Sequence, residues 1–154
     1  MLAADVTTHA EIRIVPYSAD LMFQVVADVE QYPKFLPWVV ALRILKREQV
    51  KNRDVLRAEM AVGFGALREK YISRVVLDRE ARTIDVAQAS GPFKQLENHW
   101  RFTPLPDGCR VDFSLAYEFR NRMLNAVAGA AFGRVYGKMA DAFETRAKVL
   151  SNKA

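Results

Sequence analysis

Residues 38–119 consist of strand-like segments separated only by short turns, and this feature constrains the fold more than any other. The turn sequences include Asn52–Arg53–Asp54, Gly63–Phe64–Gly65 and Pro104–Leu105–Pro106–Asp107–Gly108. The turns delimit strands at about 38–48, 53–62, 66–78, 82–89, 94–103 and 109–119. Strands joined by such short turns pair with their sequence neighbours and run antiparallel. The sequence therefore predicts a six-stranded antiparallel meander.

One more strand precedes the meander, at residues 8–15. Polar and apolar residues alternate there, which is the period of a half-buried strand. We expect Ile12 and Ile14 on its buried face, and Glu11 and Arg13 on the face toward water.

Two helices complete the predicted fold. Ser18 can cap a short amphipathic helix over 19–29, and apolar residues recur at helical spacing over 121–150, a length of about 45 Å. A sheet and a helix that each carry one apolar side can bury both by packing together. The 154 residues suffice for one core, so residues 1–154 are expected to form a single domain. We expect an α+β fold in which a seven-stranded antiparallel sheet wraps the long C-terminal helix.

The composition excludes several classes of site. The sequence lacks the motifs of serine hydrolases, zinc proteases and phosphate-binding loops. A single cysteine, Cys109, cannot form an internal disulfide, and with only two separated histidines it cannot build a structural zinc site. We therefore expect no metal site and no catalytic residue.

The N-terminal residues, the length of the apolar runs and the net charge indicate where in the cell the protein resides. The first twelve residues contain no Lys or Arg, and no apolar run reaches the ~20 residues that cross a bilayer. The net charge of +5 points only weakly to an anionic partner. We expect the protein to remain where it is made, in the cytoplasm.

Two polar side chains are predicted on apolar strand faces. Strand parity places Asn98 and Ser73 there. Their apolar neighbours on these faces are Leu96, Trp100, Phe102, Tyr71, Val75 and Leu77. A buried polar group needs a partner, so each side chain either bonds the backbone or faces a ligand. An apolar pocket with a few polar anchors suits a lipid-like ligand, whereas His99 is expected on the opposite, solvated face.

Three further patterns admit more than one interpretation. Gly129, Gly133 and Gly137 follow one side of the long helix, which favours tight packing on the sheet, room for a ligand, or a helix that can open. Phe64 at a hairpin tip can contact a membrane, gate a cavity or fold back onto the core. Residues 43–57 carry six basic and two acidic residues, which suits a solvated hairpin, an anionic membrane or an RNA backbone.

Three stretches of the chain carry more specific patterns. They are EQYPKFLPW at 30–38, GPFKQLENHWRF at 91–102 and KMADAFETRA at 138–147. These stretches resemble the coenzyme Q-binding START-like family, which lies within the polyketide cyclase-like superfamily and includes a mitochondrial ubiquinone-binding chaperone of respiration and a bacterial ribosome-association toxin. The resemblance covers nearly the whole chain. It implies a helix-grip fold, in agreement with the strand order deduced above.

The resemblance also implies a function. It indicates a non-enzymatic protein that binds ubiquinone or a similar polyprenyl lipid as its ligand, needs no other cofactor and supports respiratory electron transport. The residues that fall in the family motifs are Tyr32, Pro33, Phe35, Leu36, Pro37, Trp38, Lys94, Leu96 and Trp100. With the candidates from strand and helix patterns, the predicted ligand contacts are Phe35, Leu36, Trp38, Ser73, Lys94, Leu96, Asn98, Trp100, Phe102, Val135 and Met139. Phe64 is the predicted membrane contact.

Three functions remain open at this point. The first is a bacterial quinone carrier that meets an anionic membrane peripherally. The second is a ribosome-binding toxin that blocks subunit association, for which the basic residues 43–57 could supply phosphate contacts. The third is a polyketide cyclase-like enzyme, which would need an acid or base in its cavity. None of the three involves DNA.

Overall fold

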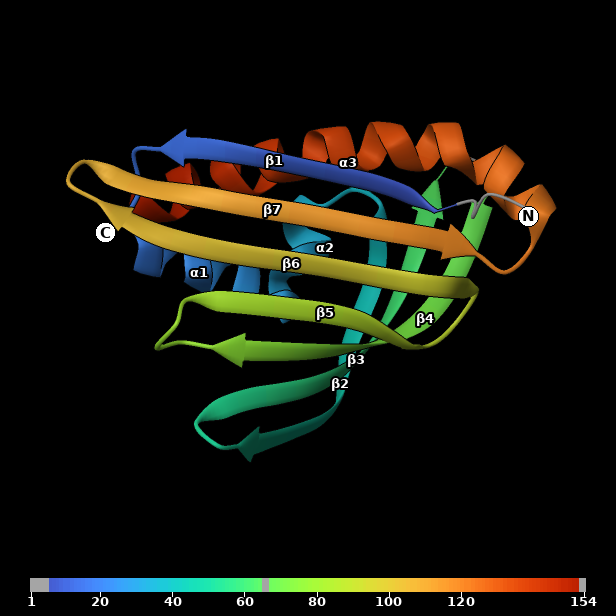
Figure 1. The fold of residues 1–154 in the computed structure, drawn as a ribbon, viewed down its shortest axis with the longest axis horizontal. Coiled ribbons are helices and arrows are strands. Elements are labelled where there is room, and N and C mark those ends of the chain that lie inside the picture. The colour runs from blue at the N-terminus through green and yellow to red at the C-terminus, as the bar shows by residue number, and fades with distance from the viewer. Residues whose placement is uncertain (1–5, 65–66, 153–154) are drawn as a thin grey trace.

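The computed structural model describes residues 6–64 and 67–152, except for the side chains of 64, 67, 127–133, 136 and 137. Strands and helices follow one another in the order that the sequence predicts (Figure 1). The elements are β1 (Thr7–Val15), α1 (Ala19–Ala27), the 3-10 helix η1 (Val29–Gln31), α2 (Tyr32–Phe35), β2 (Val39–Val50), β3 (Arg53–Phe64), β4 (Leu67–Asp78), β5 (Thr83–Ser90), β6 (Phe93–Leu105), β7 (Gly108–Phe119) and α3 (Arg122–Ser151). Between α1 and β2, residues 29–35 form the two short helices η1 and α2.

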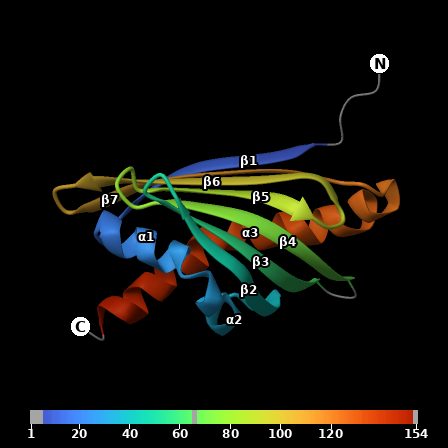
Figure 2. The same cartoon turned by 90° about the horizontal axis from the view of Figure 1, so that it is seen from below.

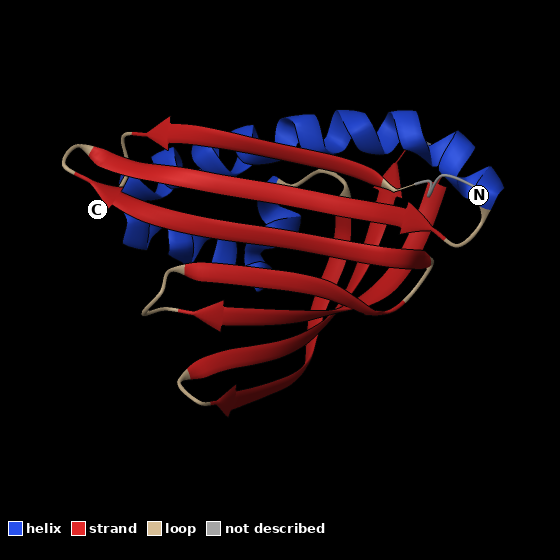
Figure 3. Cartoon of the chain, in the orientation of Figure 1, coloured by secondary structure: helices blue, strands red, loops and turns tan. Residues whose placement is uncertain are grey.

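The seven strands form one antiparallel sheet in the order β1-β7-β6-β5-β4-β3-β2. Strands β2 to β7 each pair with the next strand in sequence, so the predicted meander is confirmed. Strand β1 pairs with β7, from Thr7 opposite Tyr117 to Val15 opposite Cys109. The sheet is strongly curved, and α1, α2 and α3 all lie on its concave side (Figures 2 and 3).

Local hydrogen bonds position the long helix α3 at its first turn. The side chain of Asn121 accepts from the backbone amides of Met123 and Leu124, which caps the helix. One turn later, Asn125 bonds both backbone groups of Phe119, accepting from its N–H at 3.0 Å and donating to its carbonyl at 3.3 Å. The start of α3 is thus joined to the end of β7.

Strand β1 presents the opposite face to the one expected. Ile12 and Ile14 are 61% and 65% exposed, whereas Arg13 points toward α3. Its guanidinium lies 2.6 Å from Asp141 and 3.2 Å from Glu144. The expectation was wrong because alternation shows which residues share a face but not which face meets the helix. At this edge of the sheet, α3 offers carboxylates in place of an apolar stripe.

Within the described part of the chain, no helix has the length and apolar character that a membrane crossing requires.

Candidate ligand-binding site

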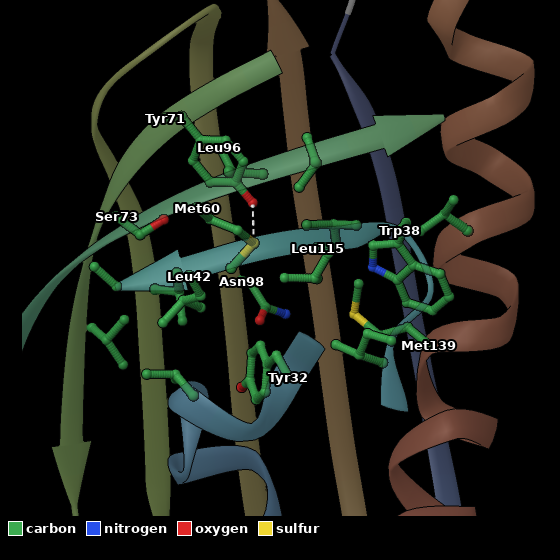
Figure 4. Close-up of a pocket in the computed structure, with 18 of the residues that line it drawn as sticks. Tyr32, Trp38, Leu42, Met60, Tyr71, Ser73, Leu96, Asn98, Leu115 and Met139 are labelled. Atoms are coloured by element: carbon green, nitrogen blue, oxygen red, sulfur yellow. Dashed lines mark hydrogen bonds between the residues drawn. The ribbon is translucent and has the colours of Figure 1, made fainter. Parts of the chain in front are cut away.

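A cavity lies between the concave face of the sheet, α2 and α3 (Figure 4). It offers about 100 Å³ to the centres of water-sized molecules. Since one water needs about 10–15 Å³ on this scale, the space suits several waters or one ring-sized group. A long lipid tail would have to extend beyond it.

Eight of the eleven predicted contact residues line this cavity. They are Leu36, Trp38, Ser73, Leu96, Asn98, Trp100, Val135 and Met139. Strand parity brings them together because alternate residues of β4 and β6 point to the concave side, while α2, its following loop and α3 close the space opposite (Figure 4). Ligand contact by these residues stays a prediction.

The other three predicted residues lie outside the cavity lining. Lys94 is exposed because the pairing of β6 with β7 shifts between Phe93 and Gln95, which turns Phe93 inward in its place. Phe102 is buried further along β6, where its ring meets Phe23 of α1 at 6.1 Å.

Phe35 also supports the cavity from outside. Its ring packs edge-on against Tyr32 and Phe143, with centroids 5.9 and 5.4 Å away. The guanidinium of Arg146 lies 5.4 Å from the centre of the Phe35 ring and covers it. Phe35, Lys94 and Phe102 therefore lie outside the lining of this cavity, and ligand contact by them stays a prediction.

Sequence reasoning missed part of the lining. Val86 and Leu115 lie directly opposite Asn98 on the two neighbouring strands, so they share its face. Tyr71 shares the face of Ser73 two residues away, and Met60 lies opposite Tyr71 on β3. Strand parity already placed Tyr71 on the face of Ser73, although not as a ligand contact, whereas the others depend on the register between strands.

The amide of Asn98 is engaged by the protein. Its Nδ2 donates to the backbone carbonyl of Ser114 at 2.9 Å, and its Oδ1 accepts from Nε1 of Trp100 at 2.8 Å. Asn98 thus orients the Trp100 indole in the cavity wall, and both halves of the amide have a protein partner.

The hydroxyls that line the cavity differ in how well they are satisfied. Tyr32 donates to the carbonyl of Val26, and burial raises the pKa of this phenol well above its ordinary value. Tyr71 donates only to the sulfur of Met60, at 3.4 Å, and burial raises its pKa to about 12. Ser73 is 3% exposed, and its hydroxyl bonds no residue that the structure describes.

The described wall of the cavity contains no Asp, Glu, His, Lys or Arg. His99 lies outside it on the half-exposed outer face, where its Nδ1 is 2.6 Å from a carboxylate oxygen of Asp85. Among the described residues, no group of His, Cys, Asp and Glu is arranged to hold a metal ion. The described wall therefore offers hydroxyl groups for binding and no pair of groups that would transfer a proton at neutral pH.

The basic segment 43–57 is largely paired with acidic residues. Arg43 lies 3.2 Å from Glu59, and Arg53 lies 3.1 Å from Asp78. Arg47 bonds Glu30. These pairs favour the solvated-hairpin interpretation, because each weakens the local positive field.

Two predictions concern groups outside the described side chains. Gly129, Gly133 and Gly137 lie along α3, but their surroundings are not part of the description. The same holds for the side chain of Phe64 at the end of β3. What these residues contact stays a prediction.

Comparison with known proteins gives the chain its family. Residues 15–144 match the family model described as polyketide cyclase / dehydrase and lipid transport. The ribosome association toxin RatA of Rickettsia prowazekii is 35% identical over 139 residues, covering 88% of this chain and 92% of the toxin. The mitochondrial coenzyme Q-binding protein COQ10 homolog B of Xenopus laevis is 32% identical over 143 residues, covering 90% of this chain and 57% of that protein.

A solved structure extends the comparison to the fold. The solution structure of the 18 kDa protein CC1736 from Caulobacter crescentus is 40% identical, with a TM-score of 0.78 and coverage of 95% of this chain and 99% of that one. START-superfamily and aromatase/cyclase proteins below 25% identity share the fold as well, which confirms the expected helix-grip architecture. By sequence and by fold, the chain belongs to the polyketide cyclase / dehydrase and lipid transport family, among relatives named RatA and COQ10.

Proposed function

We propose that this chain binds the ring of ubiquinone, or of a similar polyprenyl quinone, in the cavity between the sheet and α3, and catalyses no reaction on it. The observation that carries the proposal is an apolar, ring-sized cavity whose wall includes the hydroxyl of Ser73, which bonds no described residue and is open to the cavity. The name of the COQ10 relatives, coenzyme Q-binding protein, supports the same class of ligand.

The chemistry of the wall supports binding rather than catalysis. A cyclase-like enzyme would need an acid or base that changes protonation near neutral pH. Burial raises the pKa of Tyr71 to about 12, so this phenol stays protonated and acts as a hydrogen-bond donor. The proposal assigns it no proton transfer.

Magnitudes support a carrier that holds the ring while the tail lies elsewhere. An aromatic-sized ring buries roughly 150–250 Å², which contributes about 4–6 kcal/mol at 25 cal/mol per Å². Association itself costs at least ~4 kcal/mol in lost translational and rotational freedom. Ring burial alone therefore gives weak binding. The tail must add apolar contacts, either with α3 or with a bilayer, and that requirement agrees with the proposed peripheral membrane contact.

The two tryptophans provide the direct test, because Trp38 and Trp100 both line the cavity and are the only two in the chain. Titration with decylubiquinone should quench their fluorescence in a saturable manner, whereas free N-acetyltryptophanamide should show only linear quenching. Lipid extraction from the purified protein, followed by mass spectrometry, should recover a quinone. Linear quenching in the protein together with no recovered quinone would refute the proposal.

Ribosome association is a second candidate, favoured by one specific observation. The chain matches RatA of Rickettsia prowazekii over 92% of the toxin's length but spans only 57% of the COQ10 relative. Sedimentation of the purified chain with ribosomal subunits at low and high salt tests this candidate, since phosphate contacts weaken steeply with salt. Failure to co-sediment at low salt would remove it.

A further inference from the structure

We infer that β4 supplies the polar anchor of the site: the hydroxyls of Ser73 and Tyr71 bind a carbonyl oxygen of the ligand ring, so the ring enters with that oxygen directed at β4. This inference rests on the proposed function and names the residues that determine its specificity. It also moves the polar anchor away from Asn98.

Two other polar side chains of the wall, Asn98 and Tyr32, already have strong protein partners. Asn98 donates to the Ser114 carbonyl at 2.9 Å and accepts from the Trp100 indole at 2.8 Å. The hydroxyl of Tyr32 donates its only hydrogen to the Val26 carbonyl. A ligand could recruit these groups only by breaking bonds that hold the wall together.

Ser73 is in the opposite situation. It is 3% exposed and lines the cavity, and its hydroxyl bonds no described residue. No fully buried side-chain nitrogen or oxygen among the described residues lacks a hydrogen-bond partner, so the Ser73 oxygen reaches the open space of the cavity. Whatever enters the cavity can satisfy it, and a carbonyl oxygen does so by accepting its hydrogen.

Tyr71 completes the anchor. Its hydroxyl donates at 3.4 Å to the thioether of Met60, which is a weak acceptor that a carbonyl readily replaces. The ring is held by Phe93, whose centroid lies 5.5 Å away in an edge-on contact. Gly91 packs so closely that a Cβ there would lie 2.4 Å from the Cβ of Tyr71. The ring of Tyr71 is therefore fixed in position, while its hydroxyl can exchange the Met60 sulfur for another acceptor.

The position of the two hydroxyls orients the ligand. Tyr71 and Ser73 are two residues apart in β4 and so point to the same side of the sheet. Trp38 and Met139 lie at the other end of the cavity, beside α3 (Figure 4). A ring whose oxygen meets β4 directs its opposite edge, and any tail attached there, toward α3. The site should therefore bind less well a ring of the same size that has no oxygen on the edge facing β4.

The test compares Ser73→Ala and Tyr71→Phe with wild type, using decylubiquinone as the probe and tryptophan quenching as the affinity measurement. Each variant should raise Kd about five- to tenfold, the effect of one lost hydrogen bond. Ser90→Ala and Tyr17→Phe are matched controls outside the cavity and should leave Kd unchanged.

Two further measurements separate anchoring from a structural effect. Ser73→Ala should melt close to the wild-type temperature without ligand, because the hydroxyl it removes bonds no described residue, yet gain less from added quinone. In infrared spectra, the carbonyl band of the bound quinone should lie at lower frequency than in hexane, and the double variant should reverse that shift. Absence of decylubiquinone binding by wild type would overturn the proposed function together with the anchor. Normal binding with unchanged Kd and carbonyl band in both variants would overturn the anchor alone.

Discussion

The contact between Arg13 and α3 makes a quantitative prediction about how the helix is held on the sheet. The Arg13 guanidinium contacts Asp141 at 2.6 Å, Glu144 at 3.2 Å and Glu11 at 3.1 Å. The Arg13 side chain is 24% exposed, but Asp141 is 66% exposed, so each pair is partly screened by water. At roughly 0.2–1 kcal/mol a pair, Arg13→Met should lower the free energy of unfolding by about 1–2 kcal/mol. The substitution also leaves the carboxylates of Glu11, Asp141 and Glu144 close together without the Arg13 charge.

Thermal denaturation monitored by circular dichroism measures this effect. A loss of that size in a domain of this length lowers Tm by about 3–6 °C, and the loss should shrink in 1 M salt, where screening is strong. Arg110→Met is the matched control, because Arg110 pairs with Asp112 of its own strand, at 3.0 Å, and with no side chain of α3 that the structure describes. If Arg13→Met and Arg110→Met have the same Tm at low salt, electrostatic attachment of α3 through β1 is refuted.

Four more outcomes are expected. Gly91→Ala should lower the free energy of unfolding by about 2 kcal/mol or more in urea denaturation, because φ is +154° and the new Cβ would lie 2.4 Å from Tyr71; a neutral result would contradict the packing. Burial raises the Tyr71 pKa from 10.0 to about 12. The buried, protonated phenol therefore contributes fully to stability below pH 10, and this contribution is lost as the pH rises toward 12. Tyr71→Phe should flatten this pH dependence of Tm in thermal melts recorded at several pH values. His99→Ala should leave quinone binding intact, since its side chain is 52% exposed outside the cavity; a tenfold loss in a folded variant would restore an active role for it. Phe64→Ser should weaken sedimentation with anionic liposomes by the roughly 1.5–3 kcal/mol of one buried Phe without lowering Tm. Equal sedimentation of wild type and Phe64→Ser, in low and high salt alike, would exclude the tip.

The sequence predicted the architecture well because its signals are local. Turn residues and alternating patterns define each hairpin, and a long 3.6-residue period marks α3, so the meander and the covering helix follow without long-range information. The same locality explains the errors. Alternation in β1 could not show that Arg13, rather than Ile12, faces α3. The shifted pairing at Phe93 is invisible in the pattern that placed Lys94 with Leu96.

The site was predicted in outline for a related reason. Parity correctly grouped Ser73 and Asn98 with apolar neighbours on the concave face, and the family motifs supplied Leu36 and Trp38. Parity cannot show which polar group is already satisfied. That depends on the register that brings the Ser114 carbonyl to Asn98, and on the absence of a comparable partner for Ser73 among the described residues.

The pairing of β1 with β7 sets the order in which this chain can fold during synthesis. Each strand from β3 to β7 pairs with the strand synthesised just before it, so the meander can grow as the chain lengthens. Thr7 instead lies opposite Tyr117, so the first strand made is the last that can pair. Closing such a long loop is entropically unfavourable and slow. Until β7 emerges, the backbone N–H and C=O groups of β1 have no partner strand, and such an unpaired strand edge favours aggregation and chaperone capture.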